Sequence, residues 1–181
     1  MNKFIKMPLF LGVTCLVAGG MLAGVSALTD PVIAAAKLER EAKAYIVMYN
    51  DENVKLHEQI TVDSATAEAT GIQTISKVEH KDGISIVYKM KSKSKYETLL
   101  FNVGIDQDAG AVDSYCFLEK VNSTSDLGTN VFNQDDKVNE LYQGYTGGDK
   151  LIFGGVTFTS EGVKAAIDNA LKDFNDNRKG W

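Results

Sequence analysis

The chain has 181 residues, of which 44% are hydrophobic and 24% are charged. It is therefore long enough for one domain with a packed core, and too apolar to be disordered throughout. Its formal net charge of −5 argues against nucleic acid as a partner, because phosphates attract basic surfaces. The two cysteines, Cys15 and Cys116, lie in an apolar run and in an expected strand, so we expect no disulfide between them.

An uncharged segment dominates the N-terminus. Lys3 and Lys6 precede residues 7–28, a run that as a helix would span about 30 Å and so cross a bilayer. This pattern predicts a cytoplasmic N-terminus at residues 1–6, a single transmembrane helix at residues 7–28, and an extracytoplasmic remainder held at the cell membrane. The alternative is an export signal cleaved after Ala27. Both alternatives place the rest of the chain outside the cytoplasm.

Residues 29–70 are interpreted as a juxtamembrane helix and a connector. Asp30-Pro31 is typical of a helix start, because proline needs no acceptor at the first helical position. Apolar residues at helical spacing then predict that the helix continues to about Tyr49. Residues 50–70 are polar and irregular, with a short helix expected at about 63–69.

Residues 71–181 are expected to form the extracytoplasmic domain, with an antiparallel sheet at its centre. Two sets of alternating apolar residues predict half-buried strands: Ile84, Ile86, Tyr88 and Met90, then Leu99, Phe101, Val103 and Ile105. A turn at residues 106–110 leads to a third strand at residues 111–119. This turn lacks the glycine and glutamate of a calcium loop, so calcium is not expected there. The lysine-rich stretch at residues 89–95 is interpreted as a solvated hairpin tip, with an anionic lipid or acidic partner as the alternative.

The C-terminal part predicts a short helix at residues 134–142, a short strand at residues 150–153 and a long final helix. An apolar stripe defines the final helix: Val163, Ala166, Ile167, Ala170, Leu171 and Phe174. Thr159 or Ser160 is expected to cap its N-terminus. The expected fold is therefore α+β, an antiparallel sheet with packed helices behind one N-terminal transmembrane helix.

The usual catalytic and metal-binding patterns are missing from the sequence. His57 and His80 are far apart in polar contexts and are expected at the surface; no zinc spacing, nucleophile elbow or phosphate-binding loop occurs. We therefore expect no catalytic residues of the usual kinds and no metal site. The candidate site is instead the passage from Gly154 to Ser160. Its glycines let another group approach the backbone, and its hydroxyls lead into a helix N-terminus that favours a phosphate. The alternative is an ordinary strand-to-helix turn.

This passage, Gly155-Val156-Thr157-Phe158-Thr159-Ser160, resembles the C-terminal signature of the FMN-binding domain family, Ser-Gly-Ala-Thr-x-Thr-Ser followed by a helix. That family includes flavin-bearing components of the Rnf electron-transport complex and of the sodium-translocating NADH:quinone reductase. The resemblance extends to the N-terminal layout and to Val103-Gly104-Ile105-Asp106. It also includes residues 123–128, where the family has Glu-Thr-Pro-Gly-Leu-Gly and this chain keeps Thr124, Leu127 and Gly128.

The resemblance implies FMN joined by a phosphoester to Thr157, attached by a flavin transferase. The other cofactor-binding positions that it implies are Gly154, Gly155, Thr159, Ser160, Thr124, Leu127 and Gly128. The implied function is a membrane-anchored flavoprotein electron carrier among other membrane subunits of an ion-translocating, Rnf-like complex. The chain has Leu151, Gly154 and Val156 where the signature has Asp, Ser or Thr, and Ala. The alternative is therefore a membrane-tethered scaffold or binding module of the same descent without flavin.

Overall fold

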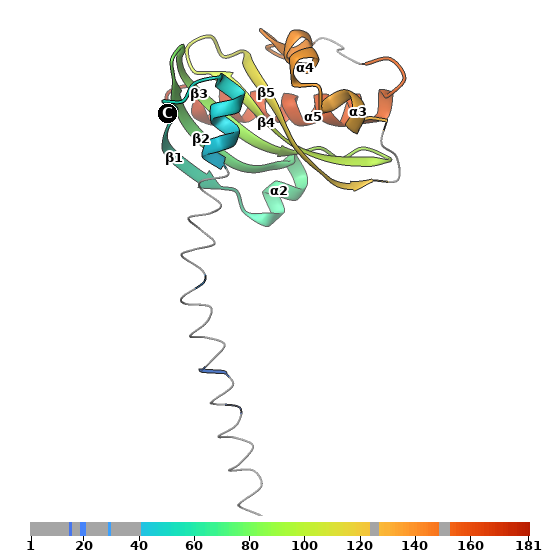
Figure 1. Ribbon diagram of the computed structural model, residues 1–181, viewed down its shortest axis with the longest axis horizontal. Coiled ribbons are helices and arrows are strands. Elements are labelled where there is room, and N and C mark those ends of the chain that lie inside the picture. Colours follow the sequence, from blue (N-terminus) through green and yellow to red (C-terminus); the bar gives the residue numbers. More distant parts are fainter. Residues whose placement is uncertain (1–14, 16–18, 21–28, 30–40, 124–126, 149–152) are drawn as a thin grey trace, which may run out of the picture. The chain divides into compact units, whose positions relative to one another are not determined.

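The computed structural model describes residues 15, 19–20, 29, 41–123, 127–148 and 153–181 (Figure 1). Two compact units divide the chain, Met1–Glu41 and Ala42–Trp181. The second unit has a five-stranded antiparallel sheet at its centre, in the order β1-β2-β3-β4-β5. The strands are β1 (Lys55–Thr61), β2 (Ile72–His80), β3 (Gly83–Lys91), β4 (Glu97–Asp106) and β5 (Val112–Ser123). The α+β class with an antiparallel sheet and packed helices is therefore confirmed.

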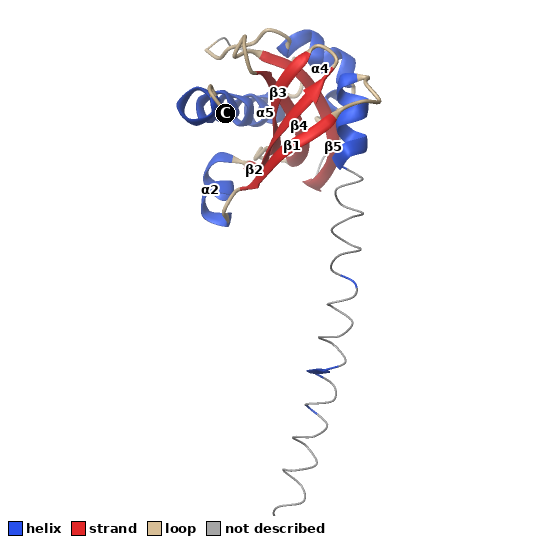
Figure 2. Ribbon diagram, turned by 90° about the vertical axis from the view of Figure 1, so that its left-hand side faces the viewer, coloured by secondary structure: helices blue, strands red, loops and turns tan. Residues whose placement is uncertain are grey.

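The labelled helices connect and cover this sheet. They are α2 (Ser64–Thr70), α3 (Thr129–Phe132), α4 (Asp135–Tyr142), α5 (Thr157–Asp173) and the π turn η1 (Phe174–Arg178). Residues 42–49 form a further helix before β1, which we call the back helix. Figure 2 shows α5 and the back helix on different sides of the sheet, so both faces are covered.

The face beneath α5, the front face, carries the main hydrophobic core. One cross-strand row on it consists of Ile75, Tyr88, Val103 and Tyr115, all buried. The apolar stripe predicted for the final helix packs onto this face, and Val163, Ile167 and Leu171 are buried in the same cluster. Periodicity of 3.6 in the helix and 2 in the strands therefore gives one continuous core.

The face beneath the back helix, the back face, is built from smaller residues. Its corresponding cross-strand row is Ser76, Val87, Gly104 and Ser114. Tyr45 and Tyr49 of the back helix lie over this row, and Gly104 provides the room, because a Cβ there would lie 2.2 Å from the Tyr49 hydroxyl oxygen. The back helix can therefore approach the sheet closely.

The connector between the back helix and β2 is more ordered than the sequence predicted. Residues 50–70 contain the edge strand β1, which the sequence analysis missed. They also contain α2, which confirms the short helix expected near residues 63–69. The Asp63 side chain caps α2 by accepting from the N–H groups of Ala65 and Thr66. The expectation of an irregular connector was therefore wrong for β1 and right for α2.

Several sequence predictions can be compared with the remaining elements. The strands expected around Ile86 and Phe101 correspond to β3 and β4, and the third corresponds to β5, which is longer than expected. The helix expected at residues 134–142 is α4. The strand expected at residues 150–153 lies outside the described residues except for its last residue. In the part of the chain that the structure describes, no helix is long and apolar enough to cross a membrane; the predicted span at residues 7–28 lies almost entirely outside that part.

The two cysteines are both free thiols. Cys116 is buried in β5, and burial raises the pKa of its thiol to about 12. Since the thiolate is the reactive form, this side chain is a core residue rather than a nucleophile.

Candidate functional site

A shallow cavity of about 110 Å³ lies where three distant segments meet at the start of α5. Its walls come from Tyr96 and Glu97 at the start of β4, from Leu127 before α3, and from residues 155–159 at the first turn of α5. Of the residues predicted from the family resemblance, Gly155, Thr157, Thr159 and Leu127 all line this cavity. The fold thus brings two of the predicted motifs together, although they are separated by about 30 positions in sequence.

The first turn of α5 presents an exposed hydroxyl and uncapped backbone donors. The helix begins at Thr157, and its N-cap residue, Val156, makes no side-chain capping bond. The first N–H groups of a helix have no intrahelical acceptors, and the helix dipole adds partial positive charge there. Thr157 is exposed at this end. A phosphate esterified to its hydroxyl would therefore lie where a helix stabilises an anion.

Thr159 and Ser160 have roles other than the predicted cap. Both are buried inside the first turn of the helix. The Ser160 hydroxyl oxygen accepts from the N–H of Phe153 at 3.1 Å, so it closes the turn that precedes the helix. Thr159 packs against Gly128, where a Cβ would lie 2.5 Å from the Thr159 methyl carbon. The prediction that either residue caps the helix was therefore wrong, because the helix begins at Thr157 and both residues lie inside its first turn.

Glu97 fixes the loop that forms the opposite wall. Its carboxylate is buried and accepts from the N–H groups of Gly128 at 2.8 Å and Thr129 at 2.7 Å. The Thr129 hydroxyl also donates to it, at 3.3 Å. Sequence reasoning missed this residue. The signal was present, because Glu97 stands two positions before Leu99 and so continues the inward-facing set of β4.

Exposed apolar side chains gather around the cavity. Tyr96, Leu127 and Phe158 are 43%, 65% and 51% exposed, and they are three of the six large hydrophobic residues exposed in the described ranges. The rings of Tyr96 and Phe158 meet edge to face with their centroids 5.6 Å apart. Scattered exposed hydrophobic residues need no explanation, but a cluster around a cavity is typical of a binding site.

The remaining cofactor-binding positions implied by the resemblance differ in where they lie relative to the cavity. Gly128 borders the cavity through its contacts with Glu97 and Thr159. Gly154 is exposed beside the cavity without lining it, and an added Cβ would meet nothing within 4 Å. Gly155 has φ +84°, a conformation that favours glycine. Thr124 lies outside the described residues.

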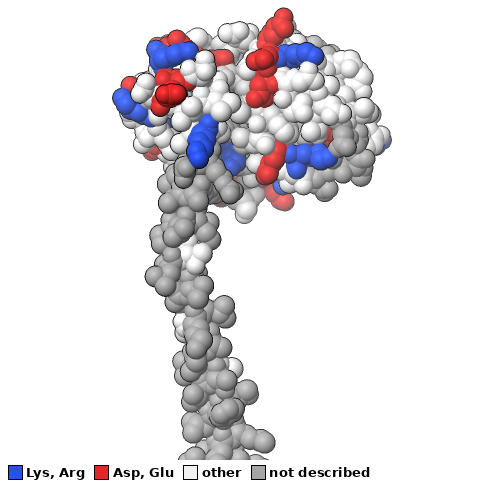
Figure 3. Space-filling view, in the orientation of Figure 1, with Lys and Arg blue, Asp and Glu red and all other residues white. Residues whose placement is uncertain are grey.

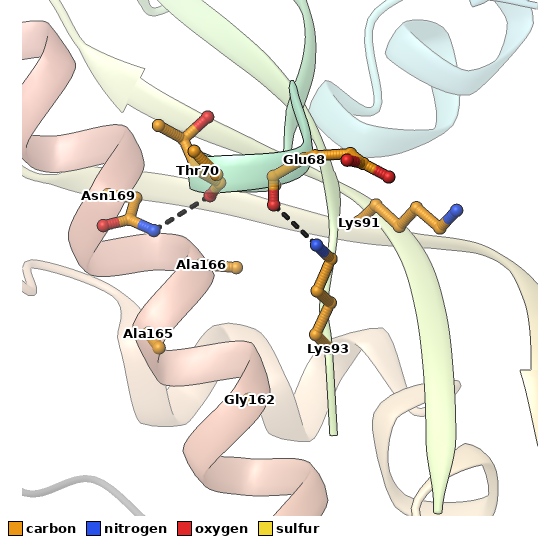
Figure 4. A pocket seen from close by; sticks show the side chains of 10 residues that line it. Glu68, Thr70, Lys91, Lys93, Gly162, Ala165, Ala166 and Asn169 are labelled. Atoms are coloured by element: carbon orange, nitrogen blue, oxygen red, sulfur yellow. Dashed lines mark hydrogen bonds between the residues drawn. The ribbon is translucent and has the colours of Figure 1, made fainter. Parts of the chain in front are cut away.

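A second cavity, of about 150 Å³, lies between α2, the end of β3 and α5 (Figure 4). The Lys93 ammonium donates to the carbonyl oxygen of Glu68 at 2.6 Å, and the Asn169 amide donates to that of Thr70 at 2.9 Å. Both bonds cross the cavity edge and tie α2 to the rest of the domain. These polar groups therefore have structural partners within the chain.

A buried polar cluster on the back face contains serine, histidine and aspartate. The Ser85 hydroxyl donates to the Asp113 carboxylate, and His80 Nε2 lies 2.9 Å from the Ser85 oxygen. His80 Nδ1 accepts from the N–H of Asp82, so a neutral His80 carries its proton on Nε2 and donates to Ser85. It cannot accept the proton of Ser85 in that form, which excludes the arrangement of a hydrolytic triad.

Burial in this cluster affects both His80 and Asp113. The His80 side chain is only 4% exposed, whereas a surface position was expected; the His57 side chain is exposed, as predicted. Burial raises the pKa of Asp113, and the hydrogen bond from Ser85 partly offsets that effect. The Tyr49 hydroxyl also donates to Asp113, at 3.4 Å, which links the back helix to the cluster.

The described residues include no group of three or more metal-ligating side chains that could hold a metal ion. In the turn at residues 106–110, the Asp106 carboxylate accepts from the N–H groups of Asp108 and Ala109. On the face shown in Figure 3, basic and acidic side chains are interspersed rather than gathered into a field of one sign. Comparison with models of known protein families and with curated protein sequences finds no match.

Proposed function

We propose that the protein is a membrane-anchored flavoprotein electron carrier that holds FMN through a phosphoester on Thr157. The observation that carries this proposal is the cavity at the start of α5. There, the exposed Thr157 hydroxyl, an uncapped helix N-terminus and the Leu127 loop lie together. The resemblance to the FMN-binding domain family named Thr157 and the Leu127 loop as cofactor-binding positions from motifs far apart in sequence. The likeness also supports a place among other membrane subunits of an ion-translocating electron-transport complex.

The residues present fit the phosphate and part of a planar ring. The helix N-terminus offers backbone donors to the phosphate. The cavity is too small for a whole isoalloxazine ring, so the remainder would lie against the exposed side chains of Tyr96, Leu127 and Phe158. Glu97 holds the Leu127 loop in place through its bonds to Gly128 and Thr129. When bound, flavin supplies reversible uptake of one or two electrons.

Attachment requires an activated flavin donor, which we propose is a flavin dinucleotide bound by a flavin transferase. The Thr157 oxygen attacks the phosphorus on the flavin side of the donor's pyrophosphate. The pyrophosphate bond breaks, a nucleoside monophosphate leaves, and the threonine proton is transferred to a base of the transferase or to the leaving phosphate. No electrons are exchanged in this step. The exposure of Thr157 gives an external enzyme access to the hydroxyl.

The test is covalent flavin on exported protein produced with a flavin transferase. Wild type should fluoresce in a denaturing gel, and its intact mass should increase by FMN less water. Thr157→Ala should lose the flavin, whereas Thr157→Ser keeps a hydroxyl at the same place and should retain at least part of it. Fluorescence that persists in Thr157→Ala would place the attachment elsewhere.

A variant that restores a residue of the family signature distinguishes a protein that is poorly flavinylated from one that no longer carries flavin. Gly154→Ser restores the hydroxyl residue of the family signature, and the open space around Gly154 accommodates it without strain. Thr157→Ala can be added as a matched control. Absence of flavin from both wild type and Gly154→Ser would favour the alternative, a membrane-tethered scaffold or binding module without flavin.

The membrane topology is tested separately. Lys137 is exposed on α4 and the native Cys116 is buried, whereas Cys15 is exposed, so Lys137→Cys is made in a Cys15→Ser background. We expect an impermeant thiol reagent to label this variant in whole cells, with Cys15→Ser alone as the control. Labelling only after lysis would contradict the extracytoplasmic location.

A further inference from the structure

A single lysine stands over the aromatic rim of the cavity. The Lys95 ammonium lies 5.2 Å from the centroid of the Tyr96 ring and 5.4 Å from that of Phe158. Both distances are within the range of cation–π attraction. Lys95 is exposed, and among the described residues it has no ion-pair partner. The nearby Glu97 carboxylate is bound instead to the N–H groups of Gly128 and Thr129.

The backbone that carries Lys95 is fixed from three directions. The Ser94 hydroxyl donates to the carbonyl oxygen of Glu97 at 2.6 Å and accepts from its N–H at 2.9 Å, which closes the turn. Glu97 is in turn bound to the N–H of Gly128. On the other side, Gly162 of α5 packs so closely that a Cβ there would lie 2.7 Å from the Lys93 carbonyl oxygen. This hairpin tip is therefore docked on the start of α5, rather than a freely solvated tip as the sequence suggested.

We propose that Lys95 tunes the reduction potential of the flavin carried at Thr157, an inference that rests on the proposed function. A flavin ring against Tyr96 and Phe158 would share its surroundings with the ammonium that lies over them. The fully reduced ring loses a proton near neutral pH and becomes an anion, and a nearby cation favours the charged form. Charge near the ring nitrogens is one of the ways in which a protein sets a flavin's electronics. Lys95 thus favours reduced over oxidised flavin and raises the potential.

The experiment is potentiometric titration of the purified flavinylated protein, followed by its visible absorption spectrum. Lys95→Met removes the charge but keeps an unbranched chain of similar length. At a given potential, we expect its ratio of reduced to oxidised flavin to be about tenfold lower than that of wild type. For a two-electron couple this corresponds to a potential about 30 mV lower. Lys95→Arg keeps the charge and should remain close to wild type. Because exposed charges are screened by salt, the difference between Lys95→Met and wild type should shrink at high ionic strength.

Lys137→Met is the matched control, since it removes an exposed lysine from α4. An unchanged potential in Lys95→Met overturns the proposal, and so does an equal shift in Lys137→Met, which would indicate an effect of net charge alone. Loss of flavin from Lys95→Met with retention in Lys95→Arg would assign Lys95 to attachment rather than to tuning. Wild type without flavin overturns the proposed function and this inference together, and it is recognised before any titration.

Discussion

The two faces of the sheet are stabilised by different means. The front face packs large side chains, such as Phe101 and Tyr88, into a hydrophobic core against α5. The back face carries serines and Gly104 beneath the back helix. Its hydrophobic cluster is smaller, and hydrogen bonds such as that from the Tyr45 hydroxyl to Ser76 add to it. Volume lost in a core costs transfer energy and leaves a cavity, whereas a hydrogen bond lost has a smaller net cost. The front face should therefore determine global stability, and the back face should determine whether the back helix stays docked.

The largest effect is expected from truncation on the front face. Phe101 is fully buried and packs against Tyr115 with ring centroids 5.2 Å apart. Phe101→Ala should lower the free energy of unfolding by about 3–5 kcal/mol, and Leu171→Ala on α5 by about 2–5 kcal/mol. Urea denaturation measures both, with Val47→Ala as the control because Val47 is 70% exposed on the back helix. Equal stability of Phe101→Ala and Val47→Ala would contradict the placement of the core.

The next effect comes from adding volume on the back face. In Gly104→Ala the new Cβ would lie 2.2 Å from the Tyr49 hydroxyl oxygen and 2.3 Å from the Asp113 carboxylate. Overpacking of this kind costs about 1–3 kcal/mol, and here it should push the back helix away. Tyr49→Phe removes the clashing hydroxyl, so in the double variant the two effects should not add. Strict additivity of the two unfolding free energies would mean that the back helix does not contact Gly104.

A third effect depends on pH. Because the folded protein raises the pKa of Asp113, its contribution to stability is present at low pH and is lost as pH rises through the folded pKa. Asp113→Asn cannot ionise, so the stability of wild type relative to this variant should fall as pH rises from about 4, the ordinary aspartate value, through the raised pKa of the folded state. Urea denaturation across this range tests the sign. Parallel curves of stability against pH for the two proteins would show that folding does not shift the pKa of Asp113.

The smallest effect isolates one hydrogen bond on the back face. Tyr45→Phe removes the 3.0 Å bond to Ser76 but keeps the buried ring. The Ser76 oxygen also accepts from the Gln59 amide at 3.3 Å, so it is not left without a partner. We expect a loss of about 0.5–1.5 kcal/mol in urea denaturation. A loss as large as that of Phe101→Ala would remove the distinction between the two faces.

Strict periodicity explains which strands and helices were predicted correctly. Leu99, Phe101, Val103 and Ile105 alternate without interruption in β4, and the stripe of α5 is equally regular. In β2 the buried apolar residues Ile72, Ile75 and Val78 are three apart, for two different reasons. A register shift between Ile72 and Thr74 brings Ile72 and Ile75 into the same front-face cluster, whereas Val78 is buried in the cluster of the back face. This irregularity hides the strand from an alternation test. β1 is an edge strand with mostly exposed polar residues, so it has no apolar pattern to detect.

The candidate site was predictable where a motif marks it and unpredictable where tertiary contacts build it. Thr157 and Leu127 were identified from the resemblance, and they meet at one cavity. The role of Glu97 depends on the position of Gly128, which only the folded chain provides. Ser160 has the chemistry of a helix cap, but its hydroxyl accepts from Phe153 instead. Local propensity therefore indicated the right segment, and packing decided the function of each hydroxyl.

The close approach of Gly128 to Thr159 limits which residues can replace this glycine during evolution. At position 128 every side chain would collide with Glu97 and Thr159, whose own positions are fixed by burial. Gly154, by contrast, stands in open space and has no positive φ. In a library randomised at both positions and selected for folded protein, we expect position 128 to return almost only glycine and position 154 to return a broad set of residues. Some glycine and serine codons differ by a single base, so a lineage could gain or lose a hydroxyl at position 154 repeatedly without disturbing the fold.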